Sequence, residues 1–503
     1  MKTIETSSRP IVGRLIVAAV TALLLGLPEP GGAQEVPGLQ ILTAAQDAMA
    51  DAIARSEKSV VSIARVVKRR DAPATPAFSL RGNRFGNLFP LDPPRDPRDP
   101  DFIPNEFSTG VVIGAEGLIL TNYHTLDLEQ QNVYWVTTTG RKVYRAKVRA
   151  ADPRYDLAVL ELPELGSGRL TPITMGSSAK LKKGHFVISL GNPYAIARDG
   201  QVSASWGIVS NFGRKAAPKP TAGDQIGKST LHHYGTLIQT DAKLNLGTSG
   251  GALLNLKGEM VGLTTALAAH SGYDQSAGYA IAVDETFLRV VERLKKAKEV
   301  EFGLLGIQPE NLSEDRIRRG EEGAFVRTVY SGTPASKSGL RNGDIIKAVG
   351  RTPVRDADSL VLNIGRLSVG SLTRLTVQRG GQLVHVDVEL AKFPVKGKKI
   401  FTPPPAWRGM RVDYSSVLSL RRREGLALLE DSVVVIEVET GSLAWKSGLR
   451  SGDIITHVDN LRVGAPRKFL EAVEGKTGNV QVRLGGAAAF DNPLRTIKAR
   501  DDS

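Results

Sequence analysis

A short glycine-rich stretch contains the residue best suited to nucleophilic chemistry in this chain. Its sequence is Gly247-Thr248-Ser249-Gly250-Gly251. Glycines on both sides leave the Ser249 hydroxyl uncrowded and allow neighbouring backbone N–H groups to turn toward one point. Converging donors of this kind can stabilise an oxyanion. A plain glycine-rich turn is the alternative interpretation, since short motifs of this type also occur without a chemical role.

A serine hydroxyl needs a base before it can act as a nucleophile near neutral pH. His124 follows the apolar run Ile119-Leu120-Thr121, and Asp156 directly precedes the apolar run Leu157-Ala158-Val159-Leu160. Each has an ordinary alternative explanation, as a surface or core histidine and as a turn-capping aspartate. Together with Ser249 they predict an imidazole that deprotonates the hydroxyl and a carboxylate that orients the imidazole.

Short strands are expected to position these three residues. Between residues 108 and 290, β-rich runs are broken by Gly, Asn and Asp, which is typical of an all-β barrel or sandwich. We expect strands at 60–67, 110–113, 118–121, 133–138, 157–162, 186–190, 207–210, 237–242 and on both sides of a Lys-Gly turn within 252–262. Amphipathic spacing predicts helices over 42–56 and 287–298.

The N-terminus predicts export. Basic residues precede an apolar run over 15–27, and small residues end at Ala33, a pattern typical of a secretory signal peptide over 1–33. An uncleaved membrane anchor is the alternative. The 503-residue chain contains no cysteine, so disulfides and thiol chemistry are excluded.

Composition narrows the classes of partner. The net charge of +14 is spread along the chain, so we expect no nucleic-acid partner. We infer instead that the charge attracts the protein to anionic envelope surfaces or acidic proteins. The sequence shows no zinc-ligand spacing, phosphate loop or dinucleotide fingerprint. We therefore expect no metal and no cofactor.

Two further features divide the chain. Residues 68–105 are rich in Pro, Arg and Asp and predict a mobile insertion. The segment Lys337-Ser338-Gly339-Leu340-Arg341-Asn342-Gly343-Asp344-Ile345-Ile346 recurs over 446–455 with a single difference, which indicates two copies of one module. Residues 393–406 carry several prolines and lysines and predict a linker.

These motifs together resemble the HtrA/DegP family of periplasmic trypsin-like serine proteases with PDZ domains. T-N-x-H, D-x-x-x-D-L-A-V-L, G-N-P, G-I-V-S, I-Q-T-D-A and G-x-S-G-G-x-L occur in this order, followed by two G-L-x-x-G-D-I-I repeats. The resemblance implies a mainly β fold. A chymotrypsin-like double β-barrel would occupy 34–298, α+β PDZ domains would occupy 299–392 and 407–499, and the linker 393–406 would lie between them.

The resemblance also implies roles for the reactive residues. His124 resembles the general base, Asp156 the acid that orients it, and Ser249 the nucleophile, while the backbone N–H groups of Gly247 and Ser249 would hold the oxyanion. The segment Ser189-Leu190-Gly191-Asn192-Pro193 resembles the neighbourhood of the activation loop. Order in that loop would control whether the oxyanion hole is formed.

A substrate pocket (S1) is implied beside the serine. Its wall would come from Leu263-Thr264-Thr265 and Ala277-Gly278-Tyr279-Ala280, with Lys243 at its base. The family usually has a small or apolar residue where Lys243 stands. An inward ammonium would favour acidic or polar side chains at the cleavage site, whereas a lysine that extends to solvent would have no such effect. Thr248 stands where the family usually has Asn. Its β-branched side chain restricts the backbone beside the peptide that must turn when the oxyanion hole forms.

Each PDZ module has a loop that resembles a carboxylate-binding loop. Such loops grip a peptide's C-terminal carboxylate with backbone N–H groups while the peptide adds as a strand. Leu304-Leu305-Gly306-Ile307 fits the apolar-Gly-apolar pattern well. Trp407-Arg408-Gly409-Met410 fits less well, because Arg408 replaces an apolar residue.

The resemblance therefore implies an ATP-independent serine endopeptidase that degrades unfolded or misfolded envelope proteins through an acyl-enzyme intermediate. Its PDZ domains would bind peptide C-termini for substrate selection or activation. The resemblance implies a periplasmic location and a homotrimer or higher homo-oligomer. A catalytically weak or inactive chaperone or scaffold of the same fold is the alternative.

Overall fold

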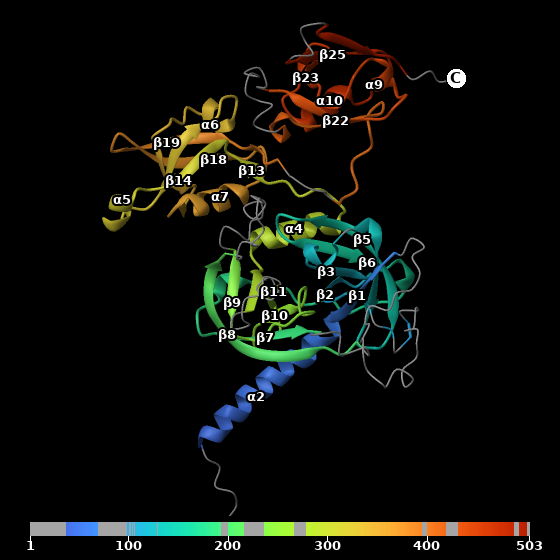
Figure 1. Cartoon of the computed structure of the whole chain (residues 1–503), viewed down its shortest axis with the longest axis vertical. Helices are drawn as coiled ribbons and strands as arrows, with labels where there is room; N and C mark the ends of the chain where they lie inside the picture. The colour runs from blue at the N-terminus through green and yellow to red at the C-terminus, as the bar shows by residue number, and fades with distance from the viewer. Residues whose placement is uncertain are drawn as a thin grey trace, which may run out of the picture. The chain divides into compact units, whose positions relative to one another are not determined.

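The structure is a computed structural model, shown in Figure 1. It describes residues 37–68, 98–99, 102, 104, 106–127, 129–192, 200–215, 236–265, 278–394, 400–418, 431–486 and 492–499. The predicted signal peptide and most of the predicted insertion at 68–105 lie outside these residues. Contacts divide the chain into two compact units, Met1–Asp51 and Ala52–Ser503.

Helix α2 (Pro37–Ser56) is the first described element. The prediction placed its start at residue 42, where the apolar spacing becomes regular. The helix instead starts at Pro37. The fixed φ of proline suits the first helical turn, where the backbone N–H that proline lacks would have no partner within the helix. No helix in the described parts of the chain is long and apolar enough to cross a membrane.

Six antiparallel strands close into a first barrel (Figure 1). Around the barrel they are β1 (Val60–Val67), β2 (Glu106–Gly114), β3 (Leu118–Thr121), β6 (Leu157–Glu161), β5 (Val143–Asp152) and β4 (Asn132–Thr137). Alternate residues point inward, and Ile63, Val112, Ile119 and Leu160 are among the buried core side chains. Short 3-10 turns precede β1 (η1, Glu57–Ser59), lie between β3 and β4 (η2, Tyr123–Thr125, and η3, Glu129–Gln131) and follow β6 (η4, Pro163–Leu165).

Six more strands close into a second barrel. Around it they are β10 (Ala252–Leu254), β11 (Met260–Thr265), β12 (Gly278–Ala282), β9 (Leu237–Thr240), β8 (Ser203–Arg214) and β7 (Phe186–Gly191), with the 3-10 turn η5 (Ser178–Lys180) before β7. Val187, Val209, Ile238 and Val261 contribute to its core. The prediction of short β-rich runs across this region corresponds to these two barrels.

Helix α4 (Glu285–Lys295) follows the second barrel. It starts before the predicted residue 287 because the Asp284 carboxylate accepts the backbone N–H of Phe287 at 2.8 Å and caps the first turn. It ends before the predicted residue 298, where Ala297 takes the left-handed conformation (φ 51°).

The repeated segments belong to two modules of like topology. In the first, the sheet order is β14 (Ile307–Asn311), β15 (Ala324–Val329), β16 (Ile345–Val349), β18 (Leu372–Arg379) and β19 (Gln382–Glu389), with β17 (Thr352–Pro353) on β16. A pair of short strands, β13 (Gly303–Leu304) and β20 (Ala391–Lys392), and helices α5 (Glu314–Arg318), α6 (Pro334–Lys337) and α7 (Ala357–Gly365) complete it.

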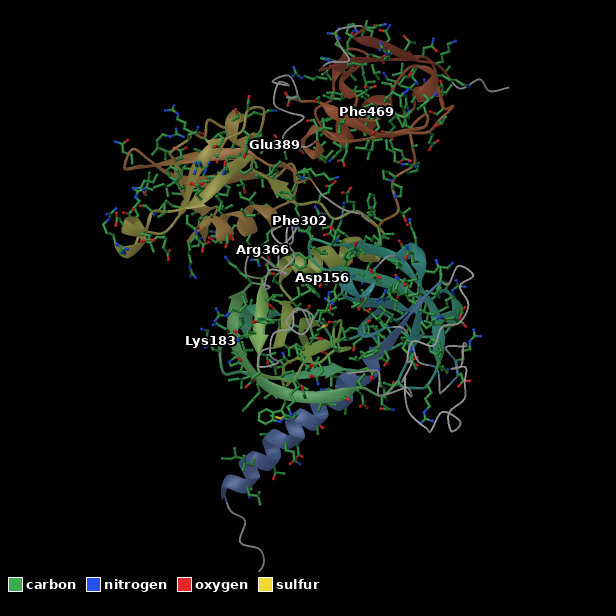
Figure 2. The ribbon with its side chains drawn as sticks, viewed as in Figure 1. Asp156, Lys183, Phe302, Arg366, Glu389 and Phe469 are labelled. Atoms are coloured by element: carbon green, nitrogen blue, oxygen red, sulfur yellow. The ribbon has the colours of Figure 1, made fainter. Side chains whose placement is uncertain are left out.

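The second module repeats this strand order. Its sheet contains β21 (Met410–Tyr414), β22 (Val433–Val438), β23 (Ile454–Val458), β25 (Val480–Gly485) and β26 (Leu494–Ile497), with β24 (Leu461–Arg462) on β23. Its helices are α9 (Leu443–Lys446) and α10 (Pro466–Val473), with the 3-10 turn η9 (Ser415–Val417) after β21. Phe469 of α10, labelled in Figure 2, is buried in its core. In both modules the first strand of the sheet is an edge strand, which leaves room for an added strand.

Candidate active site

Three strand ends bring His124, Asp156 and Ser249 together. His124 lies in η2 after β3, Asp156 in the turn from β5 to β6 (labelled in Figure 2), and Ser249 in the loop from β9 to β10. His124 Nδ1 lies 2.8 Å from Asp156 Oδ2, and His124 Nε2 lies 3.3 Å from Ser249 Oγ. The imidazole therefore bridges a carboxylate and a hydroxyl, which is the arrangement that proton transfer from the hydroxyl requires.

Asp156 is held in place by its backbone as well as by its side chain. Its Oδ1 accepts the backbone N–H of His124 at 2.9 Å. Its carbonyl accepts the Tyr123 N–H at 3.1 Å and the Asn122 side-chain Nδ2 at 3.2 Å. Asp156 has a φ of 52°, an unfavourable region for a residue with a Cβ. These hydrogen bonds offset that strain and aim the carboxylate at the imidazole.

A buried ion pair braces the same turn. Arg154 Nε lies 3.1 Å from Asp152 Oδ1, and the Arg154 backbone N–H donates to the same oxygen at 2.9 Å. Tyr155 is also buried, and its hydroxyl donates to Asp284 Oδ1 at 3.2 Å. Burial raises the pKa of Tyr155, and the nearby Asp284 carboxylate raises it further, so this phenol stays neutral. The turn that carries Asp156 is thus fixed at both ends.

Glycine is required on both sides of Ser249. Gly247 and Gly250 have φ values of 94° and 85°, which L side chains rarely adopt. A Cβ at Gly247 would lie 2.6 Å from Asn192 O and 2.6 Å from Phe107 Cδ2. A Cβ at Gly250 would overlap Thr109 O and Thr121 Oγ1. The glycine-rich stretch is therefore a tightly packed loop.

Hydrogen bonds to carbonyl groups orient the peptide that carries the Ser249 N–H. Thr248 O accepts from Thr264 Oγ1 at 2.6 Å and from the Gly251 N–H at 3.0 Å. Because C=O and N–H point in opposite directions across a trans peptide, these bonds direct the Ser249 N–H away from Thr264. Thr264 was predicted to line the S1 pocket, and the structure places its hydroxyl behind the serine loop.

Thr248 closes a small ring in the same loop. Its backbone N–H and its Oγ1 both donate to Asn245 O, at 3.1 and 2.7 Å. Its Cβ also lies against Gly191, where an added Cβ would come within 3.1 Å. The β-branch thus fits this conformation of the loop.

The predicted pocket residues are mostly buried around this loop. Leu263, Thr264 and Thr265 of β11 are buried, as are Gly278 and Ala280 of β12. Thr265 Oγ1 has no hydrogen-bond partner among the described residues. Ala277 and Pro193 lie outside the described residues.

Lys243 does not line a buried surface. Its side chain is exposed, and its carbonyl accepts the Ser205 hydroxyl at 3.0 Å. The adjacent Leu244 instead contacts Gly278, where an added Cβ would lie 2.8 Å from Leu244 Cδ1. This placement agrees with the alternative in which the lysine extends to solvent.

The loop Leu304-Leu305-Gly306-Ile307 borders a cavity in the first of the two repeated modules. The cavity has a volume of about 110 Å³, and its lining includes this loop together with Leu360 and Ile364 of α7. Gly306 has a φ of 84°, and a Cβ there would overlap Thr333. The loop therefore turns between an apolar groove and the edge strand β14.

The corresponding loop of the second module differs. Trp407 and Met410 exchange two backbone hydrogen bonds of 3.0 Å, so the loop is a closed turn. Trp407 packs edge-on against Phe469, with ring centroids 5.8 Å apart. The Arg408 guanidinium donates to the carbonyls of Ile497 and Lys476 at 2.8 and 3.0 Å, and also to those of Lys498, Thr477 and Gly478. Arg408 thus joins the C-terminal strand to the loop after α10.

Two residues that shape the site were not predicted from the sequence. Thr109 and Phe107 of β2 contact the loop that carries Ser249, and they do so because β2 meets the second barrel. A buried threonine in a strand is common, and its partners depend on register. No group of His, Cys, Asp or Glu in the described residues is arranged to hold a metal ion.

Comparison with known families matches three stretches of the chain. The trypsin-like peptidase domain model matches residues 108–263, and PDZ domain models match 303–390 and 434–484. Together with the two closed barrels, these matches confirm the predicted fold class of a trypsin-like double barrel followed by two PDZ domains.

Curated relatives extend over most of the chain. A probable periplasmic serine endoprotease DegP-like of Pseudomonas putida (strain GB-1) is 30% identical over 475 residues, which cover 90% of this chain and 94% of the relative. The protein of the same name from Brucella suis biovar 1 (strain 1330) is 32% identical over 387 residues, 75% of this chain and 70% of the relative. Among solved structures, the HtrA-type protease AlgW with a decapeptide is 26% identical with a TM-score of 0.50, covering 69% of this chain and 99% of that one.

Proposed function

This chain belongs to the HtrA/DegP family of trypsin-like serine endopeptidases, and from this premise we propose that Ser249 is its nucleophile. His124 is the general base, and Asp156 orients it. The observation that carries this proposal is the continuous contact from Asp156 through the imidazole to the Ser249 hydroxyl, at 2.8 and 3.3 Å.

The proposed reaction follows from this contact. His124 Nε2 takes the Ser249 proton as Oγ attacks the scissile carbonyl, while the His124 Nδ1–H donates to Asp156. The negative charge that develops on the carbonyl oxygen is stabilised by the N–H groups of Gly247 and Ser249. The imidazolium then protonates the leaving amine, which leaves an acyl-enzyme. Water, deprotonated by His124, attacks the ester and releases the second product.

We propose unfolded or misfolded envelope proteins as substrates. The relatives are named periplasmic endoproteases, and an extended backbone is needed for a peptide bond to reach Ser249. Peptide hydrolysis needs only water as the second reactant, and the sequence shows no phosphate-binding loop, so the proposal includes no ATP-driven step. A periplasmic location agrees with the predicted export signal at 1–33.

The first PDZ module supplies a second peptide site in this proposal. Its loop Leu304-Leu305-Gly306-Ile307 borders an apolar cavity beside the edge strand β14. A peptide C-terminus added to β14 would place its carboxylate at the loop and its last side chain in the cavity. In this proposal, peptide binding at this site selects substrates or activates the protease. The second module, with its closed loop at Trp407-Arg408-Gly409-Met410, contributes less to peptide binding.

Covalent labelling of the serine tests the central proposal. A fluorophosphonate probe should label the wild-type protein, and the label should be lost in Ser249→Ala and strongly reduced in His124→Ala. Casein digestion should follow the same order. Ser178→Ala is a matched control, because its hydroxyl donates to Val283 O at 2.9 Å and is no part of the proposed triad.

The opposite outcome defines the alternative function. A wild-type protein that neither reacts with the probe nor digests casein, yet suppresses aggregation of an unfolded protein, would be a scaffold or chaperone with this fold. Mass measurement in solution tests the proposed homotrimer or larger assembly in the same preparations.

A further inference from the structure

One residue of the first barrel contacts both Gly247 and Ser249 in the loop between β9 and β10, which is called the serine loop below. Thr109 lies in β2 and is fully buried. Its hydroxyl donates to Gly247 O at 2.7 Å, and its backbone N–H donates to Ser249 O at 2.8 Å. Its own carbonyl accepts the Thr121 hydroxyl at 2.8 Å. A single side chain and its peptide therefore tie the loop to the barrel that also carries His124.

The Thr109 hydroxyl acts on the peptide between the two proposed oxyanion donors. Gly247 O and the Thr248 N–H belong to the same peptide unit. The oxygen accepts from Thr109 Oγ1, and the N–H donates to Asn245 O at 3.1 Å. The unit is thus held at both ends. The flanking units carry the Gly247 and Ser249 N–H groups, and the unit that carries the Ser249 N–H is also held through Thr248 O by Thr264 Oγ1 at 2.6 Å.

The same hydroxyl also binds the segment that precedes residues 193–199. Thr109 Oγ1 accepts the Asn192 backbone N–H at 2.9 Å. The Asn192 side chain donates to Ser62 Oγ at 2.8 Å. Asn192 O in turn packs against Gly247, within 2.6 Å of where a Cβ would stand. Thr109 is therefore the shared partner of Asn192 and Gly247.

We infer that Thr109 is a positioning residue of this protease. Its hydroxyl holds the Gly247–Ser249 segment in the geometry of an oxyanion hole and links that geometry to the position of Asn192. The inference rests on the proposed roles of Gly247 and Ser249. The task requires a group that donates and accepts at once, which a hydroxyl does and an alkyl group does not. Serine should therefore replace Thr109, and valine, which has the same shape, should not.

The test compares three variants of the full-length chain. Thr109→Val removes the hydroxyl and keeps the volume, and Thr109→Ser keeps the hydroxyl. Ser56→Ala is the matched control, because it removes a buried hydroxyl that donates to Gly258 O at 2.8 Å on the β10–β11 turn. Rates of peptide hydrolysis are expressed per active site, titrated with a fluorophosphonate, so that unfolded protein does not contribute.

The expected result separates kcat from KM. A misplacement of about 1 Å at a reacting group costs about 100-fold in rate, so kcat of Thr109→Val should fall about 10- to 100-fold with KM within about threefold. Thr109→Ser and Ser56→Ala should stay within about threefold of wild type. A peptide boronate, whose tetrahedral adduct places an oxygen at the oxyanion site, should bind Thr109→Val at least about tenfold more weakly.

Each contrary result has a distinct meaning. If Thr109→Val keeps the wild-type kcat and boronate affinity while Ser249→Ala is inactive, this inference is wrong and the proposed function stands. If Ser249→Ala remains active, the proposed function itself fails. Should Thr109→Val not fold, Ser62→Ala replaces it, since it removes the side-chain tether of Asn192. It should lower kcat about 3- to 10-fold, and an unchanged kcat would contradict the link.

Discussion

Substitution of Gly247 by alanine probes whether the loop conformation or only its stability matters. Gly247 has a φ of 94°, and an alanine there pays about 1–2 kcal/mol of backbone strain. The new Cβ would also lie 2.6 Å from both Asn192 O and Phe107 Cδ2, which is far inside van der Waals contact. The loop must therefore move, and the Gly247 N–H moves with it.

The magnitude follows from the proposed role of that N–H group. Loss of one oxyanion donor costs about 10²- to 10³-fold in kcat, or about 2.7–4 kcal/mol. Gly247→Ala should show a loss of this size, with KM changed by less than about threefold because ground-state binding does not use the donor. Truncation of Phe107 in the double variant should recover only part of the rate, since Asn192 O still obstructs the Cβ.

Gly184→Ala is the matched control for backbone strain. Gly184 has a φ of 87°, and nothing lies within 4 Å of an added Cβ. It should lose about the same 1–2 kcal/mol of stability and keep wild-type kcat. Thermal unfolding and hydrolysis of a peptide substrate per titrated site measure the two quantities. If Gly247→Ala loses stability like Gly184→Ala but keeps its kcat, the assignment of the oxyanion hole is refuted.

Three other predictions concern the triad, the second PDZ module and the pH dependence of stability. Asp156→Asn should lower kcat about 10⁴-fold through loss of the correct imidazole tautomer, and a loss below tenfold in hydrolysis assays would argue against its role. Arg408→Ala should destabilise the second PDZ module by about 1–3 kcal/mol, because five carbonyls lose a charged donor. The control Arg467→Ala, which breaks an exposed ion pair with Glu471, should cost at most about 0.5 kcal/mol. Denaturant titrations distinguish them. Burial raises the pKa of Glu301 above 4.5, and the Lys392 ammonium offsets this shift only in part. The stabilising contribution of the protonated Glu301 carboxyl is therefore complete below about pH 4.5 and is lost as pH rises through its folded-state pKa. Glu301→Gln should reduce the resulting fall in thermal midpoint with pH, and parallel pH profiles of wild type and variant would contradict this prediction.

Local pattern predicted the elements better than their ends. The strand at Val60–Val67 lies where the β-branched run placed it. Helix α2 was predicted to begin at residue 42 and begins at Pro37, because the start of a helix depends on backbone geometry that apolar spacing does not report. The capping carboxylate of Asp284 was likewise missed, and it moved the start of α4 to Glu285.

Pocket and loop residues were harder to predict, because neighbours in space determine where a side chain points. Thr264 was predicted to line the S1 pocket, and its hydroxyl donates to Thr248 O, a contact that the sequence did not predict. Lys243 carries a charge that its exposed position leaves in solvent. In the second PDZ module, Arg408 matched a binding loop by position, and its guanidinium bonds to the carbonyls of the same module.

The sequence by itself indicated the candidate reactive residues, because a serine, a histidine and an aspartate of suitable chemistry each occur in a short contiguous motif. The repeated glycine-rich segment likewise identified two copies of one module. Tertiary structure alone decided which backbone groups hold the serine loop. Thr109 and Asn192 are 83 positions apart, and Thr109 and Gly247 are 138 apart, so their contacts depend on how two closed barrels meet. The Thr109 hydroxyl can hold the serine loop only because folding places Asn192 and Gly247 within hydrogen-bond distance of it.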